Sequence, residues 1–167
     1  MAYIEKTIIA GEHIFKEKSF SARYGKKNIP RGPNWNECSE VQRRRNELLK
    51  KKRIVWNICT NFKKSDWWVT LTYRRSERPD SMVMAKKQRS RFIRRLREKL
   101  KKKDIPLTYT AMTERGVRGG LHHHFIIKNV FDIGIIISLW EHGKVHIENI
   151  YTDSMYDLAM YFVKGDS

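Results

Sequence analysis

The sequence predicts an α+β fold in which a central antiparallel β-sheet carries helices on one face. Segments rich in β-branched and aromatic residues alternate with long amphipathic patterns. From Trp67 onward the order is strand, helix, strand, strand, helix, strand and a final helix. This is the split βαβ order of a ferredoxin-like sheet, as in RNA-recognition modules. At 167 residues the chain is long enough for one domain with a real core and too short to expect two.

The N-terminal part, residues 1–65, is predicted to extend this core with strands, a loop and a helix. Residues 4–18 have the composition of one or two short strands, with Gly11 at a turn. Residues 24–37, YGKKNIPRGPNWNE, contain two prolines and two glycines that interrupt any periodicity. This stretch therefore predicts a loop.

A helix is predicted over residues 39–62, with Ser39 placed to cap its start. Apolar residues recur along it at seven-residue steps, the spacing of a helix that buries one side. These residues are Val41, Leu48, Val55 and Phe62. Residues 66–73, DWWVTLTY, are rich in β-branched and aromatic side chains and predict the first strand of the sheet.

A second, longer helix is predicted to open at Pro79 and Asp80 and to reach about Lys103. Its apolar positions are Met84, Phe92, Ile93, Leu96 and Leu100. From residue 82 to residue 103 it carries eleven Lys or Arg residues and a single acidic residue, Glu98. Such an unbalanced run has few partners inside the protein, which favours non-specific contact with phosphates.

The remaining segments complete the sheet. Residues 106–114 and 120–128 predict two strands joined by the glycine-rich turn RGVRGG, hence a hairpin. The Ile-rich run FDIGIIISLW predicts a short buried helix, although such runs also occur in strands. KVHIENI alternates as a strand does, and DSMYDLAMYFVKG predicts a closing helix.

Charge is the most informative bulk property. A net charge of +17 makes nucleic acid the leading partner and an anionic membrane surface the other interpretation. No run of about twenty apolar residues could span a bilayer, and the N-terminus lacks the basic-then-apolar order of a signal peptide. Cys38 and Cys59 lack metal-binding spacing and fit a reduced, cytoplasmic protein.

Three consecutive histidines, 122–124, lie inside a predicted strand. Successive strand side chains point to opposite faces, so His122 and His124 share one face and His123 points to the other. If the hairpin turn spans residues 115–121, Glu114 lies opposite His122 on the same face. Two imidazoles and a carboxylate suit Mn²⁺ or Mg²⁺ with open positions, or Zn²⁺. The alternative is a pair of ordinary surface histidines, with His123 in or near the core.

The closing helix places Tyr161 and Lys164 three residues apart, and therefore on one side. Tyr156 lies about 140° round the helix and should face elsewhere. A phenol beside a metal ion and an ammonium group can attack phosphorus, because both stabilise the developing charge. The alternative is that Tyr161 packs in the core and Lys164 is solvated.

These motifs resemble the HUH endonuclease superfamily, and most closely its rolling-circle replication initiators (Rep) of phages and plasmids with a single catalytic tyrosine. The strand WVTLTY, the glutamate before LHHHFII, and YFVK appear in the family's order. The resemblance implies the HUH endonuclease fold, with 1–167 as a single domain and 66–167 as its catalytic βαββαβα core. His122, His124 and Glu114 would bind Mn²⁺ or Mg²⁺, Tyr161 would be the nucleophile, and Lys164 would assist it.

The implied activity is metal-dependent nicking of single-stranded DNA at an origin. It leaves a 5′-phosphotyrosine and a free 3′-OH, and its reversal rejoins strands. The family's middle residue is usually apolar, so His123 leaves open a different ligand register, and relatives with two tyrosines leave open a role for Tyr156. The expected setting is the cytoplasm of a prokaryotic host, with no membrane partner and with host replication proteins as further candidates.

Four arginines flank the predicted site and are candidates for gripping the DNA: Arg74, Arg75, Arg115 and Arg118. Trp67 or Trp68 could stack on a base or belong to the core. Two alternatives share these features. One is an HUH transposase or relaxase, and the other is a non-catalytic module that binds single-stranded nucleic acid.

Overall fold

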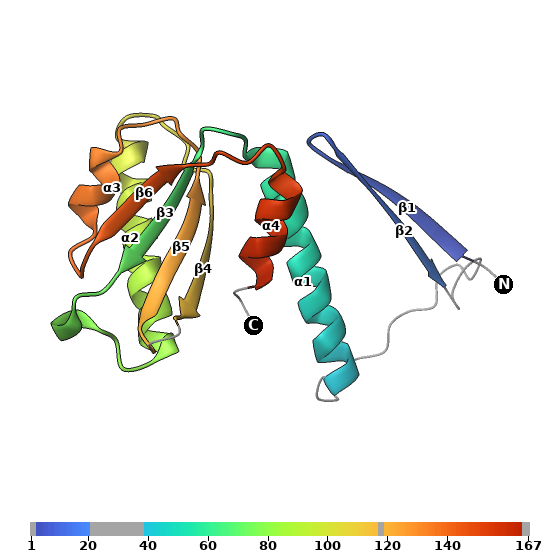
Figure 1. Ribbon diagram of the computed structural model, residues 1–167, viewed down its shortest axis with the longest axis horizontal. Coiled ribbons are helices and arrows are strands. Elements are labelled where there is room, and N and C mark those ends of the chain that lie inside the picture. The colour runs from blue at the N-terminus through green and yellow to red at the C-terminus, as the bar shows by residue number, and fades with distance from the viewer. Residues whose placement is uncertain (1–2, 21–38, 117–118, 165–167) are drawn as a thin grey trace.

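The computed structural model describes residues 3–20, 39–116 and 119–164 (Figure 1). A four-stranded antiparallel sheet has the order β4-β5-β3-β6. Its strands are β3 (Trp67–Thr72), β4 (Tyr109–Arg115), β5 (Leu121–Ile127) and β6 (Val145–Asn149). This order and the crossing helices between β3 and β4 and between β5 and β6 confirm the predicted ferredoxin-like α+β fold.

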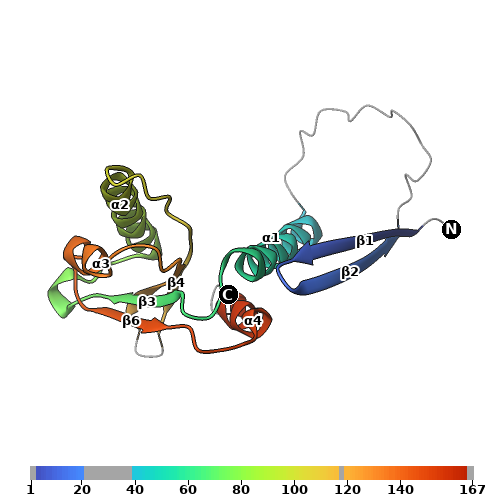
Figure 2. The same ribbon diagram turned by 90° about the horizontal axis from the view of Figure 1, so that it is seen from above.

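The two crossing helices, α2 (Met82–Lys101) and α3 (Gly134–Leu139), lie on the same face of the sheet (Figure 2). Alternate strand residues such as Val69, Leu71 and Phe125 point to this face and are fully buried. They pack in one cluster with Phe92 and Leu96 of α2. The core of the sheet is therefore on this side, as the alternation predicts.

Helix α2 begins later than predicted. Ser81 is its N-cap, because the Ser81 hydroxyl accepts a hydrogen bond from the backbone N–H of Met84 at 3.2 Å. Pro79 and Asp80 precede the helix, which ends at Lys101 rather than about Lys103. Met84 is 48% exposed, and its neighbour Ala85 is buried in its place.

The other face of the sheet is partly covered by α1 (Glu40–Asn61) and α4 (Met155–Lys164). These helices pack together and bury Met112 of β4 and Ile126 of β5 in a second core cluster. Ser39 caps α1 as predicted. The predicted apolar stripe is buried only in the second half of α1, because Val41 and Leu48 are 78% and 56% exposed.

An N-terminal hairpin, β1 (Tyr3–Ala10) and β2 (His13–Phe20), packs on the outer side of α1 (Figure 2). Gly11 makes its turn with a φ of 59°, and a Cβ there would collide with the carbonyl oxygen of Cys59. The loop predicted over residues 24–37 and Cys38 lie outside the described residues. None of the described helices has both the length and the apolar character needed to cross a membrane.

Candidate active site

The histidine triplet is divided between the two faces of β5. Glu114 of β4 pairs with His122, and Thr70 of β3 pairs with His124. The side chains of these four residues therefore lie on the face opposite α2 and α3. This is the hairpin register that the sequence predicts for Glu114 and His122.

His124 makes two polar contacts through its ring. Its Nε2 lies 3.0 Å from the Glu114 carboxylate, and its Nδ1 lies 3.1 Å from the Thr70 hydroxyl. In the tautomer that donates the Nδ1 proton to Thr70, the Nε2 lone pair faces the carboxylate. The lone pair and the negatively charged carboxylate then repel each other. A positive charge between them would remove this repulsion, so the pair suits a cation.

His122 is the third candidate ligand. Its ring centroid lies 6.3 Å from that of His124. Burial lowers the pKa of His122, and the nearby His124 lowers it further, which favours the neutral imidazole that a metal ion requires. Among the described residues, no three His, Cys, Asp or Glu side chains are arranged to hold a metal ion as they stand. The donor types fit a divalent ion, and completing the set requires the His122 ring to turn toward Glu114.

Trp68 lies between His124 and α4. Its ring centroid is 5.6 Å from that of His124 and 6.0 Å from that of Tyr161. Together these residues line a hollow of about 350 Å³ between β6, the segment that follows it, and α4. Tyr161 is 66% exposed there, so it is not a core residue. The structure thus brings Tyr161 and His124 to the same hollow.

Tyr156 faces a different part of the molecule. Its ring centroid lies 5.9 Å from that of Phe15 and 6.1 Å from that of His13, both in the N-terminal hairpin. This confirms the predicted angular separation from Tyr161. Lys164 is the last residue of α4 and is exposed.

Comparison with known proteins identifies the family. Residues 66–166, more than half of the chain, match the model of the replication-associated protein family of the ORF2 type. The chain belongs to this family. No curated protein sequence and no solved structure gives a significant match. The match supports the interpretation of the chain as a replication initiator, as the sequence motifs suggest. The matched residues do not include β1, β2 or α1.

In this replication-associated protein, His123 is a core residue and not a ligand. It is fully buried on the α2 side, with the Tyr73 hydroxyl 2.6 Å from its Nε2 and the Thr113 hydroxyl 2.9 Å from its Nδ1. Arg89 also donates to the Thr113 oxygen at 2.9 Å. Both imidazole nitrogens are therefore satisfied, and the alternative ligand register through His123 is wrong.

Acid should destabilise the protein through His123. Burial, and next the charge of Arg89, lower the pKa of His123 to about 3. The unfolded chain binds this proton near pH 6.5 and the folded chain does not, so stability is full above that pH and falls below it. The loss from this group should reach about 2 kcal/mol at pH 5.

The measurement is denaturant unfolding of the wild type and of His123→Gln between pH 7 and pH 5, both in EDTA. The wild type should lose more stability over this range, because glutamine has no titrating proton and keeps a donor and an acceptor for Thr113 and Tyr73. Equal losses in the two proteins would show that His123 does not carry the effect.

Three of the four arginines predicted to bind DNA lie in the described part of the chain. These three, Arg74, Arg75 and Arg115, lie at the same end of the sheet as His122. Arg74 and Arg75 follow β3, whose last residue, Thr72, pairs with His122. The Arg74 guanidinium donates to the carbonyl oxygen of Glu141, and that of Arg115 donates to the carbonyl oxygen of Gly119 at 3.1 Å. Arg118 lies outside the described residues.

Sequence reasoning missed some polar residues near the site in this family member. The positive charge of Arg78 acts on the pKa of His122, so Arg78 belongs to the same surroundings. On β6, His146 and Glu148 pair with Thr70 and Trp68 and face the same side. The alternation in KVHIENI placed both on one face, but only the strand order brings that face beside Trp68.

Proposed function

We propose that this replication-associated protein nicks and rejoins single-stranded DNA at a replication origin through a covalent bond to Tyr161. The observation that carries the proposal is the hollow shared by Tyr161 and His124, whose rings both lie near that of Trp68. A nucleophile for phosphorus must be open to a large substrate, and the phenol is 66% exposed.

The proposed metal ligands are His122, His124 and Glu114. A divalent ion such as Mn²⁺ or Mg²⁺ held there would polarise a non-bridging phosphate oxygen. Thr70 fixes the orientation of the His124 ring through Nδ1, so that Nε2 is the atom directed toward Glu114. The chain itself thus orients the donor atom of His124, on the side of the sheet where Tyr161 lies.

The cleavage step exchanges one phosphoester bond for another. The Tyr161 oxygen forms a bond to phosphorus while the bond from phosphorus to O3′ breaks. The phenol proton leaves to solvent, and O3′ takes up a proton. The products are a 5′-phosphotyrosyl ester and a free 3′-OH, and attack by a 3′-OH on the ester reverses the step and rejoins strands.

Lys164 is proposed to assist Tyr161. It lies one helical turn beyond Tyr161 on α4, so its ammonium group can approach the phosphate that the phenol attacks. A positive charge there stabilises the negative charge that develops on the phosphate oxygens and on the phenol oxygen. Lys164 would therefore lower the barrier without forming a bond to the substrate.

The test is incubation of the protein with random-sequence single-stranded oligonucleotides and Mn²⁺, followed by intact-mass analysis. We expect a conjugate of the protein with an oligonucleotide fragment that survives denaturation and is absent in EDTA. No conjugate with random-sequence or origin-derived strands, together with EDTA-insensitive binding, would leave a non-catalytic binding module. A transposase or relaxase would give the same conjugate, and the family match favours a role in replication.

A further inference from the structure

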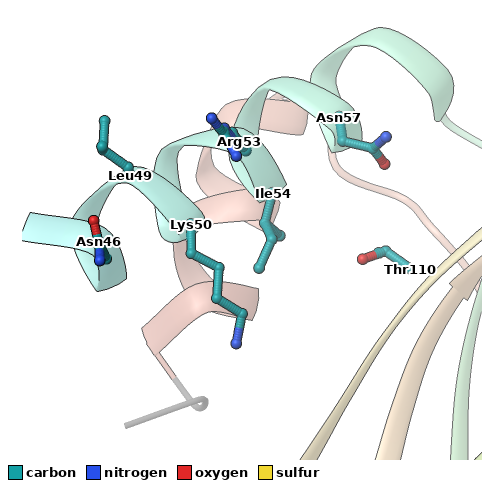
Figure 3. A pocket seen from close by; sticks show the side chains of 7 residues that line it. All are labelled: Asn46, Leu49, Lys50, Arg53, Ile54, Asn57 and Thr110. Atoms are coloured by element: carbon teal, nitrogen blue, oxygen red, sulfur yellow. The ribbon is translucent and has the colours of Figure 1, made fainter. Parts of the chain in front are cut away.

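A groove runs between α1 and the edge of the sheet at β4 (Figure 3). Its volume is about 540 Å³, which is within the usual range of ligand-binding clefts. Six lining residues come from α1 and one from β4: Asn46, Leu49, Lys50, Arg53, Ile54, Asn57 and Thr110. In Figure 3, Lys50 and Ile54 project from α1 on the side toward the sheet, and the Thr110 hydroxyl points back toward the helix.

The groove is positively charged. Helix α1 carries seven Lys or Arg residues and two Glu residues. Lys50 and Arg53 are exposed at the groove, the amides of Asn46 and Asn57 add neutral donors and acceptors, and none of the seven lining residues is acidic. Two cations beside amides suit a ligand that carries phosphates, and Leu49 and Ile54 add a short apolar surface.

The groove and the candidate active site open on the same face of the sheet. Thr110 and Glu114 are both on β4 and four residues apart, so their side chains point the same way. At the rise of an extended strand, this separation is roughly 13 Å. A bound chain that lies along β4 can therefore reach from the groove to His122, which pairs with Glu114.

We propose that this α1 groove binds the single-stranded DNA segment that leads to the scissile phosphate. The groove is the gap between one helix and one strand, and the proposed nicking reaction takes a single strand as its substrate. Helix α1 lies outside the residues 66–166 that match the family model, whereas Thr110 on the other side of the groove lies within them. The inference rests on the proposed function for its substrate.

The first test removes the two groove cations in Lys50→Ala/Arg53→Ala. The matched control is Arg44→Ala/Lys51→Ala, which removes two cations from the same helix. Lys51 lines a different hollow beside β2, and Arg44 lies seven positions before it, on the same side of the helix. Binding of a fluorescent single-stranded oligonucleotide is measured by anisotropy between 0.1 and about 1 M salt.

The groove variant should lose two phosphate contacts. The slope of log affinity against log salt should become shallower by about 1.4, and affinity at 0.1 M salt should fall about 25-fold if the proteins converge at 1 M. The control should keep the wild-type slope. A groove variant with the wild-type slope, or a control that loses as much, would overturn the proposal.

A second variant blocks the groove without changing its charge. Asn57 is exposed, so Asn57→Trp should fold normally, with an unchanged melting temperature, and should weaken single-strand binding. Conjugate formation is recorded in the same samples. If the wild type forms no conjugate but the groove variants lose affinity, the nicking proposal fails and the groove stands. If the wild type forms the conjugate but both groove variants keep the wild-type affinity, the groove proposal fails and the nicking proposal stands.

Discussion

A Tyr161→Phe chain is expected to form no covalent conjugate with single-stranded DNA and to bind it with the affinity of the wild type. The substitution removes only the attacking oxygen, and the exposed ring can still lie beside Trp68. Loss of a nucleophile cannot be compensated by binding, so the rate of conjugation should fall at least about a thousand-fold. Gel analysis in denaturant measures the conjugate, and anisotropy measures the affinity.

Tyr156→Phe is the matched control for this prediction. Tyr156 is on the same helix but contacts Phe15 and His13 of the N-terminal hairpin, so its loss should leave conjugation unchanged. If Tyr156→Phe abolishes the conjugate and Tyr161→Phe does not, the nucleophile is misassigned. If both variants still form it, the covalent bond is to another residue.

Much of the site was predictable because it depends on strand periodicity. Alternation alone separates His123 from His122 and His124, and the length of the glycine-rich turn places Glu114 opposite His122. The strand order also follows from the sequence of elements, since the split βαβ topology fixes which strands pair. These features are local or topological, so they do not depend on how helices pack.

The rest depended on tertiary packing. The position of α4 is set by its contacts with α1 and with Met112 and Ile126, and these contacts bring Tyr161 next to Trp68. No spacing in the sequence indicates that Thr70 holds the His124 ring. For the same reason the pattern on α1 overstated its burial, because in the described part of the chain the buried residues of this helix all lie in its second half.

Replacing the proposed ligands should remove metal binding. In His122→Ala/His124→Ala, Glu114 remains as the only proposed donor, and a single carboxylate binds Mn²⁺ weakly. We expect the affinity for Mn²⁺ to fall at least about 100-fold, measured by the electron paramagnetic resonance of free Mn²⁺ during titration. Conjugation with DNA should fall in parallel, while the melting temperature in EDTA should stay close to that of the wild type.

His146→Ala is the matched control, because His146 is on the same face and contacts Glu148 at the β6 edge. It should bind Mn²⁺ as the wild type does. If His122→Ala/His124→Ala keeps the wild-type affinity for Mn²⁺, the ion binds elsewhere, and His146 and Glu148 become the next candidate ligands. The wild type could instead take up no Mn²⁺ and still conjugate DNA in EDTA. The contact of His124 with Glu114 would then be a hydrogen bond with no catalytic metal. The positive charge that stabilises the phosphate would come from the protein alone.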